Sequence, residues 1–161
     1  MTDRNVFSLE MAVRDYECDL QAVVNNGVYQ NYLEHARHEY LKSLGIDFAK
    51  LAAEGTNLVV VRVEIDYKYP LRSGDAFTVD VQPERISPVR IGFRQVIWRL
   101  PDHKEVIRAL VVGTALNAKG RPRIPAELEA ALFPPREERD PAQLRGAAPL
   151  WSPPFPPSGP R

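Results

Sequence analysis

The stretch VRDYECDLQAVVNNGVYQNYLEHARHEYL, residues 13–41, decides the fold because its pattern changes halfway along. From residue 28 onward apolar and aromatic side chains recur every three or four positions, which is the period of an amphipathic α-helix. The members of this series are Tyr29, Tyr32, Leu33, Ala36, Tyr40 and Leu44. Gly45 follows at once and is typical of the residue that ends a helix. We therefore predict one helix from Val28 to Leu44.

The residues on either side of this helix favour β-strands. Residues 7–13 alternate between apolar and polar side chains, which is the period of a half-buried strand. Four more alternating or apolar runs follow the helix, separated by turns rich in Pro, Gly and Asp, at residues 58–69, 77–84, 89–100 and 106–117. A short closing helix is expected from Pro125. A sheet that curls around the long helix buries the apolar faces of both, so we predict an α+β domain with about five antiparallel strands.

Composition limits the kind of protein. A chain of 161 residues with 44% hydrophobic content supports one domain, expected over residues 1–133, without disulfides. Lys plus Arg and Asp plus Glu both total 21, so no bulk positive field attracts nucleic acid or an anionic membrane. Nine of the 15 prolines lie in residues 134–161, which we predict to be a proline-rich tail without regular helix or sheet.

Other features of the sequence predict a cytoplasmic protein. No apolar run approaches the ~20 residues of a membrane span, and residues 1–10 lack the pattern of a signal peptide. The single cysteine, Cys18, suits a reducing compartment. A catalytic thiol needs a nearby base, but the sequence neighbours of Cys18 are carboxylates, which disfavour the thiolate. We expect Cys18 to be a bystander.

Two histidines invite a metal site. His35 and His38 are three residues apart on the predicted helix, but the spacing is not that of a helical zinc motif and no third ligand is evident. Both lie on or beside the polar face, where solvated side chains are usual. We therefore expect no metal and no other cofactor.

An acid precedes the helix start and has two possible roles. Asp19 is followed by VVNNG, which leads into the helix. The first turn of a helix offers unpaired N–H groups and a partial positive charge, so it can hold an oxyanion beside a carboxylate that attacks or activates water. Alternatively Asp19 or Asn25 simply caps the helix, which such residues often do. Spacing alone favours the capping role.

Three segments carry a resemblance to a known family. They are VRDYECDLQAVVNNGVYQNYLE at residues 13–34, YPLRSGD at 69–75 and GRPRIP at 120–125. With these motifs the chain, over residues 6–133, resembles the 4-hydroxybenzoyl-CoA thioesterase-like group of hotdog-fold acyl thioesterases. Its residues RDYE followed by VVNN are most similar to the plant and bacterial acyl-carrier-protein and enediyne-pathway branches of that group.

The resemblance implies a fold, an assembly and a reaction. The fold is a hotdog, a sheet of about five antiparallel strands wrapped around one long helix. The assembly is a homodimer with sheets joined edge to edge, often paired into a homotetramer, with each active site at a subunit boundary. The reaction is hydrolysis of an acyl-CoA or acyl-carrier-protein thioester without a cofactor. A non-catalytic acyl-CoA-binding protein with the same fold is the alternative.

The resemblance also implies roles for particular residues. Asp19 would be the catalytic nucleophile or general base, and the backbone N–H of Asn26 would polarise the thioester carbonyl. Substrate would be bound by Asn25, Tyr29, Arg90 and Arg121, with Arg90 foremost, and Arg121 beside Arg123 second, for the CoA phosphates. The length of the acyl pocket would depend on which of Tyr32, Leu58, Val60, Val61 and Phe93 point into the cleft and on what the partner subunit contributes, and the sequence leaves both open. The chain departs from the family at Ala22, where Gly is common, and at Asn26, where many members have His.

Overall fold

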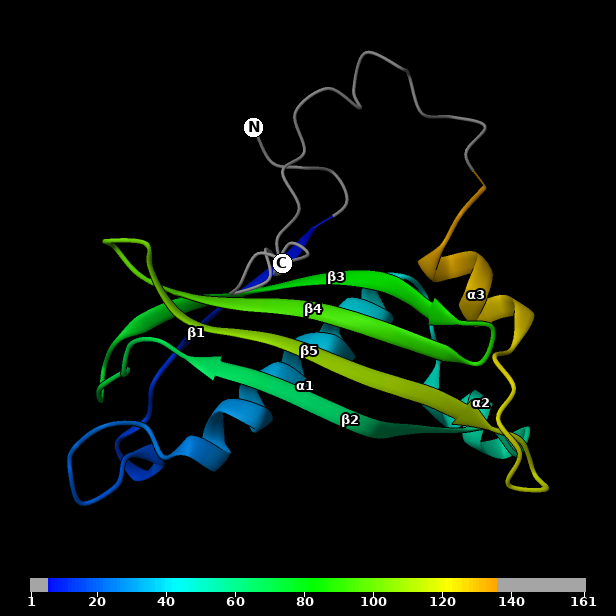
Figure 1. Ribbon diagram of the computed structural model, residues 1–161, viewed down its shortest axis with the longest axis horizontal. Helices are drawn as coiled ribbons and strands as arrows, with labels where there is room; N and C mark the ends of the chain where they lie inside the picture. Colours follow the sequence, from blue (N-terminus) through cyan, green and yellow to red (C-terminus); the bar gives the residue numbers. More distant parts are fainter. Residues whose placement is uncertain (1–5, 136–161) are drawn as a thin grey trace, which may run out of the picture.

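The computed structural model describes residues 6–135, and Figure 1 shows a curved sheet with a long helix across one face. The sheet has the antiparallel order β1-β3-β4-β5-β2. Its strands are β1 (Phe7–Ala12), β2 (Asn57–Tyr67), β3 (Ala76–Ser87), β4 (Arg90–Arg99) and β5 (Lys104–Leu116). The long helix is α1 (Asn26–Ser43), and a short 3₁₀ turn, η1 (Asp15–Glu17), precedes it. The predicted α+β hotdog fold is confirmed.

Two short helices cover one end of the sheet, and one of them was not predicted. The closing helix α3 (Ala126–Leu132) follows Pro125 as expected, whereas α2 (Phe48–Ala53) was missed. Asp47 caps α2 by accepting a hydrogen bond from the backbone N–H of Lys50 at 3.1 Å, and Gly55 follows the helix with a φ of +82°. Six residues are too few for a helical period to be visible in the sequence.

The core lies between α1 and the sheet, as the helical series predicts. Leu33 and Ala36 of α1 have no exposed surface, and the same is true of Phe77 on β3 and Ile107 on β5. The rings of Tyr32 and Phe77 pack 4.7 Å apart. Burying each large apolar side chain contributes about 1.5–3 kcal/mol, so this contact fixes α1 firmly on the sheet.

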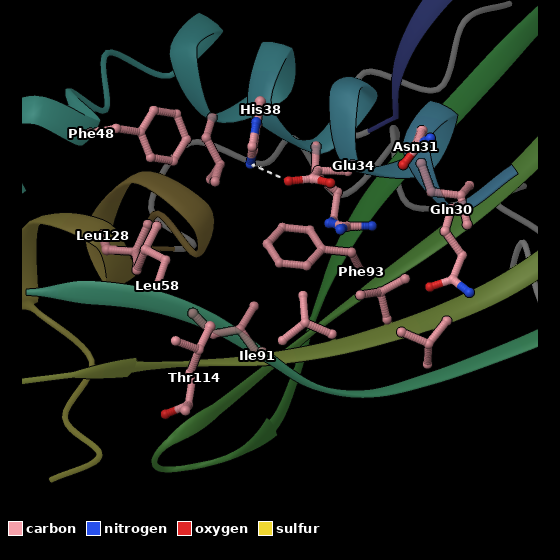
Figure 2. Close-up of a pocket in the computed structure, with 18 of the residues that line it drawn as sticks. Gln30, Asn31, Glu34, His38, Phe48, Leu58, Ile91, Phe93, Thr114 and Leu128 are labelled. Carbon is pink, nitrogen blue, oxygen red and sulfur yellow. Dashed lines mark ion pairs between the residues drawn. The ribbon is translucent and has the colours of Figure 1, made fainter. Parts of the chain in front are cut away.

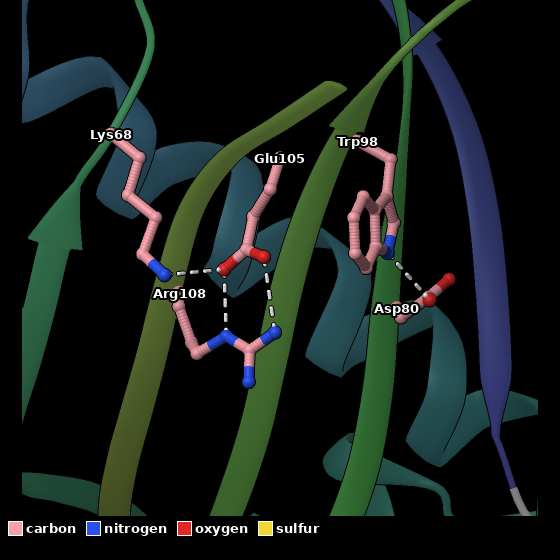
Figure 3. Close-up of polar contacts among 5 residues, drawn as sticks. All are labelled: Lys68, Asp80, Trp98, Glu105 and Arg108. Carbon is pink, nitrogen blue, oxygen red and sulfur yellow. Dashed lines mark hydrogen bonds and ion pairs between the residues drawn. The ribbon is translucent and has the colours of Figure 1, made fainter. Parts of the chain in front are cut away.

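Charged side chains cover the face of the sheet that is turned away from α1 (Figure 3). Glu105 accepts hydrogen bonds from Arg108 at 2.7 and 3.1 Å and pairs with Lys68 at 3.0 Å. Burial alone would raise the pKa of Glu105, but the bonds from Arg108 and Lys68 outweigh it and hold that pKa below its usual range. Nearby, the Trp98 indole donates to Asp80 at 3.0 Å. This face is therefore polar and internally paired.

Strand β2 forms one edge of the sheet and is unusually apolar for an exposed edge. The exposed fractions of Val60, Val61 and Val63 are 51%, 46% and 38%. The pairing of β2 with β5 shifts register between Val60 and Arg62. An apolar edge strand with free backbone groups is a ready surface for pairing with another strand.

The remaining expectations concern the ends of the chain and the membrane. Apart from Pro134 and Pro135, the predicted proline-rich tail lies outside the described residues, so the boundary at residue 133 stays a prediction. Within residues 6–135, no helix is long and apolar enough to cross a membrane.

Candidate active site

The segment before α1 folds back on itself and is tied to the body of the protein. Cys18 and Val24 form an isolated antiparallel bridge, and the N–H of Asp19 donates to the carbonyl of Val23 at 2.9 Å. The N–H of Val24 donates to the carbonyl of Leu71 at 2.8 Å. Residues 19–23 therefore form a small closed loop that ends directly at the helix start.

Asp19 does not cap the helix. Its Oδ1 accepts a hydrogen bond from the N–H of Gln21 at 2.8 Å and a weaker one from the N–H of Val23 at 3.5 Å. The side chain is exposed, and Oδ2 accepts no hydrogen bond from residues 6–135. One carboxylate oxygen thus shapes the loop while the other is open to a ligand.

Asn25 caps α1. Of the two residues that the sequence offered for this role, Asp19 and Asn25, the structure selects Asn25. Its Oδ1 accepts from the N–H of Gly27 at 3.0 Å. The next residue, Asn26, has its carbonyl held by the hydroxyl of Tyr67 at 3.3 Å. In the described part of the chain, no acceptor takes the N–H of Asn26. That N–H is an unpaired donor at the positive end of a helix.

Tyr29 lies below this helix start and is almost fully buried. Its hydroxyl accepts a hydrogen bond from the N–H of Leu71 at 3.0 Å, and its ring meets that of Tyr67 edge to face. Burial raises the pKa of the Tyr29 hydroxyl. Within one chain, Tyr29 contacts Leu71, which lies in the segment that anchors the loop. Tyr29 does not line the cavity between α1 and the sheet.

A cavity with a volume of about 410 Å³ lies between α1 and the strands β2, β4 and β5 (Figure 2). Its apolar walls come from the sheet, α1, α2 and α3, and its polar side chains come mainly from α1. The apolar lining includes Leu33, Leu41, Phe48, Leu58, Val60, Val63, Ile91, Phe93, Val111, Ile124 and Leu128, and the polar lining Gln30, Asn31, Glu34, Arg37, His38 and Thr114. An elongated apolar ligand suits such a cavity.

Of the five residues that the sequence offered for the acyl pocket, three line the cavity and two do not. Leu58, Val60 and Phe93 line the cavity, but Val61 does not. Tyr32 does not line it either, because that side chain is turned into the core, where it is 2% exposed. The sequence left this choice open, because a helical period shows that a side chain is buried without showing whether it faces a cavity or the core.

Neither expected catalytic residue lines this cavity within one protomer. Asp19 and Asn26 lie near the Tyr67 end of β2, whereas α2, α3 and the hairpin between β3 and β4 lie at the other end (Figure 1). The predicted phosphate-binding arginines are also at that other end. Arg90 begins β4 and is exposed, and Arg121 is exposed in a turn closed by hydrogen bonds with Asn117. One protomer therefore does not bring the predicted site together.

Cys18 and His38 make ordinary structural contacts. Cys18 is half-buried and packs against the core. His38 pairs with Glu34 at 3.8 Å and its ring packs 5.2 Å from that of Phe48 (Figure 2). Among residues 6–135, no three side chains of His, Cys, Asp or Glu form a group able to hold a metal ion.

Sequence reasoning missed a polar pair on the cavity wall. Arg37 lies at the edge of the apolar face of α1, and its Nη1 donates to Oε1 of Gln95 at 3.0 Å. Gln95 is fully buried on β4, and its Nε2 donates to the carbonyl of Leu33 at 3.0 Å. The available signal was a Gln at an inward position of the strand.

Comparison with known proteins supports the architecture. Residues 13–135 match the family model of the thioesterase-like superfamily. The crystal structure of a 1,4-dihydroxy-2-naphthoyl-CoA thioesterase from Synechocystis superposes with a TM-score of 0.75 over 79% of this chain and 95% of that one, at 18% identity, and so supports the fold alone.

Relatives in sequence extend the comparison. The chain is 40% identical over 123 residues to the chloroplastic acyl-acyl carrier protein thioesterase ATL3 of Arabidopsis thaliana, covering 76% of this chain and 65% of the relative's length. It is 28% identical over 120 residues to the long-chain acyl-CoA thioesterase FadM of Escherichia coli, covering 74% of this chain and 90% of that protein. On the match to the family model, this chain belongs to the thioesterase-like superfamily.

Proposed function

We propose that the protein hydrolyses acyl thioesters, with Asp19 and the N–H of Asn26 at the reacting centre. The observation that carries the proposal is that two groups without hydrogen-bond partners in the described part of the chain lie close together in sequence, in the segment from Asp19 to the first residue of α1. A carboxylate oxygen of Asp19 and the N–H of Asn26 both lack a partner within residues 6–135, and the Cys18–Val24 bridge holds their segment together. The names of the relatives in Arabidopsis and Escherichia coli, both thioesterases, support the same reaction class.

The chemistry follows from the charges at these two groups. The thioester carbonyl oxygen accepts a hydrogen bond from the N–H of Asn26, where the helix dipole favours the negative charge that develops as the carbonyl is attacked. The carboxylate of Asp19 either attacks the carbonyl carbon itself or takes a proton from an attacking water. The C–S bond breaks, the thiolate leaves and is protonated, and water supplies the oxygen of the free acid.

A second copy of the chain completes the site in this proposal. If the apolar β2 edges of two copies pair antiparallel about a two-fold axis, the Tyr67 end of one β2 lies beside the Asn57 end of the other. Tyr67 holds Asn26, and Leu58 lines the cavity. The catalytic loop of one copy then faces the cavity of its partner, which receives the acyl chain.

The same pairing suggests where the thiol carrier binds. It moves the partner's Arg90 and Arg121 toward the end of the sheet that holds Asp19, where they would meet the phosphates of CoA or of a carrier protein's prosthetic arm. The name of the Arabidopsis relative specifies an acyl-carrier-protein thioester and that of the Escherichia coli relative an acyl-CoA thioester, so both kinds of substrate are tested. The cytoplasmic location stays a prediction, and the Arabidopsis relative is named as chloroplastic.

Asp19→Asn tests the reaction and the residue together. The substitution is nearly isosteric, so the fold should be retained while turnover of acyl-CoA and acyl-carrier-protein thioesters falls about a hundredfold or more. Glu10→Gln is the matched control, because it also turns an exposed acid into an amide but lies on β1 at the opposite edge of the sheet. Hydrolysis of a panel of short, long and aromatic acyl thioesters is measured for all three proteins.

The outcomes separate the proposal from its alternative. Loss in Asp19→Asn alone supports the assignment. Equal turnover in all three proteins would leave Asp19 with only its loop-shaping role. Tight binding of acyl-CoA without turnover by the unaltered protein would identify a non-catalytic acyl-CoA-binding protein instead.

A further inference from the structure

The cavity contains a cation that the proposed reaction does not use. Arg37 lies on the fourth turn of α1 and lines the cavity, where it is half-buried opposite the apolar strands. Its one hydrogen-bond partner within residues 6–135 is the neutral side chain of Gln95, at 3.0 Å, and no carboxylate in that range lies within ion-pair distance. Burial lowers the pKa of the guanidinium. Because the guanidinium has five N–H donors and uses only one hydrogen bond to Gln95, several donors remain for a ligand.

Gln95 fixes the direction of this cation. The side chain has no exposed surface, although it sits among apolar residues on the inner face of β4. Its amide bridges the carbonyl of Leu33 and the guanidinium of Arg37, so the two polar side chains hold each other. Replacing a buried polar pair by apolar side chains of similar size is often neutral or stabilising. The fold therefore has no clear need for the pair.

The charge beside Arg37 limits what the ligand group can be. Glu34 precedes Arg37 by one turn, also lines the cavity, and raises the pKa of Arg37 by its negative charge, against the larger effect of burial. A carboxylate placed at Arg37 would be repelled by Glu34. A neutral oxygen accepts a hydrogen bond from the guanidinium without that repulsion.

We propose that Arg37, held by Gln95, determines specificity by donating a hydrogen bond to a neutral oxygen on the acyl chain, a hydroxyl or an oxo group, inside the cavity. This inference rests on the proposed function, because it takes the cavity as the acyl site. A plain alkyl chain leaves the N–H groups of Arg37 without an acceptor, and sites built to hydrogen-bond a substrate oxygen reject analogues that lack it.

The test uses chains that differ in one oxygen. The substrates are N-acetylcysteamine thioesters of dodecanoic acid and of its hydroxy and oxo derivatives, which are positional isomers with the added oxygen at successive carbons. Non-hydrolysable amides of the same acids, with NH in place of sulfur, are the ligands for calorimetric binding. The variants are Arg37→Met, Arg37→Lys and the double variant Arg37→Met/Gln95→Leu. Lys42→Met is the control, because Lys42 is a cation of α1 that pairs with Glu39 and does not line the cavity.

We expect the unaltered protein to prefer one position of the added oxygen over the plain chain. Arg37→Met should lower kcat/KM and affinity for that isomer about tenfold, as expected for a lost hydrogen bond to a charged group, while the plain chain changes much less. Arg37→Lys should retain part of the preference. The double variant should lose the preference while its unfolding midpoint stays at or above that of the unaltered protein.

Three results would overturn the inference. One is a protein that binds all isomers and the plain chain alike. The second is an equal loss for all chains in Arg37→Met, which would make Arg37 a structural residue. The third is a change in oligomeric mass in that variant, which would make it an interface residue. A binding preference that depends on Arg37 without hydrolysis of any thioester would contradict the proposed function and leave the inference standing.

Discussion

At the scale of single residues, Ala22 shows how the loop of the candidate site reaches its shape. Family resemblance leads one to expect Gly at this position, and a different residue there suggests a different loop. Ala22 instead adopts a φ of 61°, in the left-handed region that Gly enters most readily, and its N–H donates to the carbonyl of Asp19 at 3.0 Å. The loop therefore turns tightly with a small side chain in place of none.

This conformation predicts the effect of two substitutions. Ala22→Val should lower the free energy of unfolding by about 1–2 kcal/mol, because a β-branched side chain is poorly accommodated at positive φ. Ala22→Gly should change it by less than about 1 kcal/mol, since relief of the strained φ is offset by a more flexible unfolded chain. Urea unfolding of the three proteins measures the difference. If Val is tolerated as well as Ala, the loop does not hold Ala22 at positive φ.

Residue roles could be predicted from the sequence where local chemistry decides them. Asn25 as one of two possible caps and Cys18 as a half-buried residue follow from their neighbours along the chain. The hydrogen bonds of Arg37 could not be predicted, because its partner Gln95 lies 58 residues away. Only the packing of α1 on β4 brings the two together.

At the scale of secondary structure, the edge strand β2 is where we expect a second copy of the chain to pair. Val61 is exposed, lies at the register shift of β2 and does not line the cavity, so a substitution there tests the edge without altering the acyl site. A lysine on an edge strand opposes pairing with another strand.

We therefore expect Val61→Lys to convert a dimer into a monomer of 18.2 kDa. Val89→Lys is the control, because Val89 is an exposed valine in the turn between β3 and β4. Sedimentation equilibrium at several concentrations measures both masses. A mass of two chains in both variants would contradict pairing through β2, and so would a single-chain mass for the unaltered protein.

The elements themselves were predictable to different degrees. Helix α1 and the five strands follow from long runs of regular period, and the structure moves their ends by only a few residues. Strand β2 gives a weaker signal, since exposed valines such as Val60 and Val63 look in sequence like core residues. Their exposure follows from the position of β2 at the sheet edge, which the order of the strands decides.

At the scale of the whole molecule, the topology separates groups that a single site would need. Asp19 and Asn26 lie at one end of the sheet and do not line the cavity, and Arg90 lies at the other end (Figure 1). Sequence motifs alone could not reveal this separation, because it depends on which strands pair and in which direction. We therefore infer that an active site joins the Asp19 loop of one copy to the cavity of another.

Mixed dimers test whether the Asp19 loop and the cavity of one active site come from different copies of the chain. Asp19→Asn removes the carboxylate, and Leu58→Trp fills the cavity beside Phe48 and Leu128 (Figure 2), so each variant alone should be inactive. In a mixed dimer, Asp19 from one chain faces an open cavity in the other.

Co-expression of the two variants should restore about a quarter of the unaltered activity per chain, because half of the dimers are mixed and each has one intact site. The measurement is the rate of acyl thioester hydrolysis by the co-expressed pair, relative to each variant alone. A co-expressed pair that forms mixed dimers and stays as inactive as its parents would contradict the account.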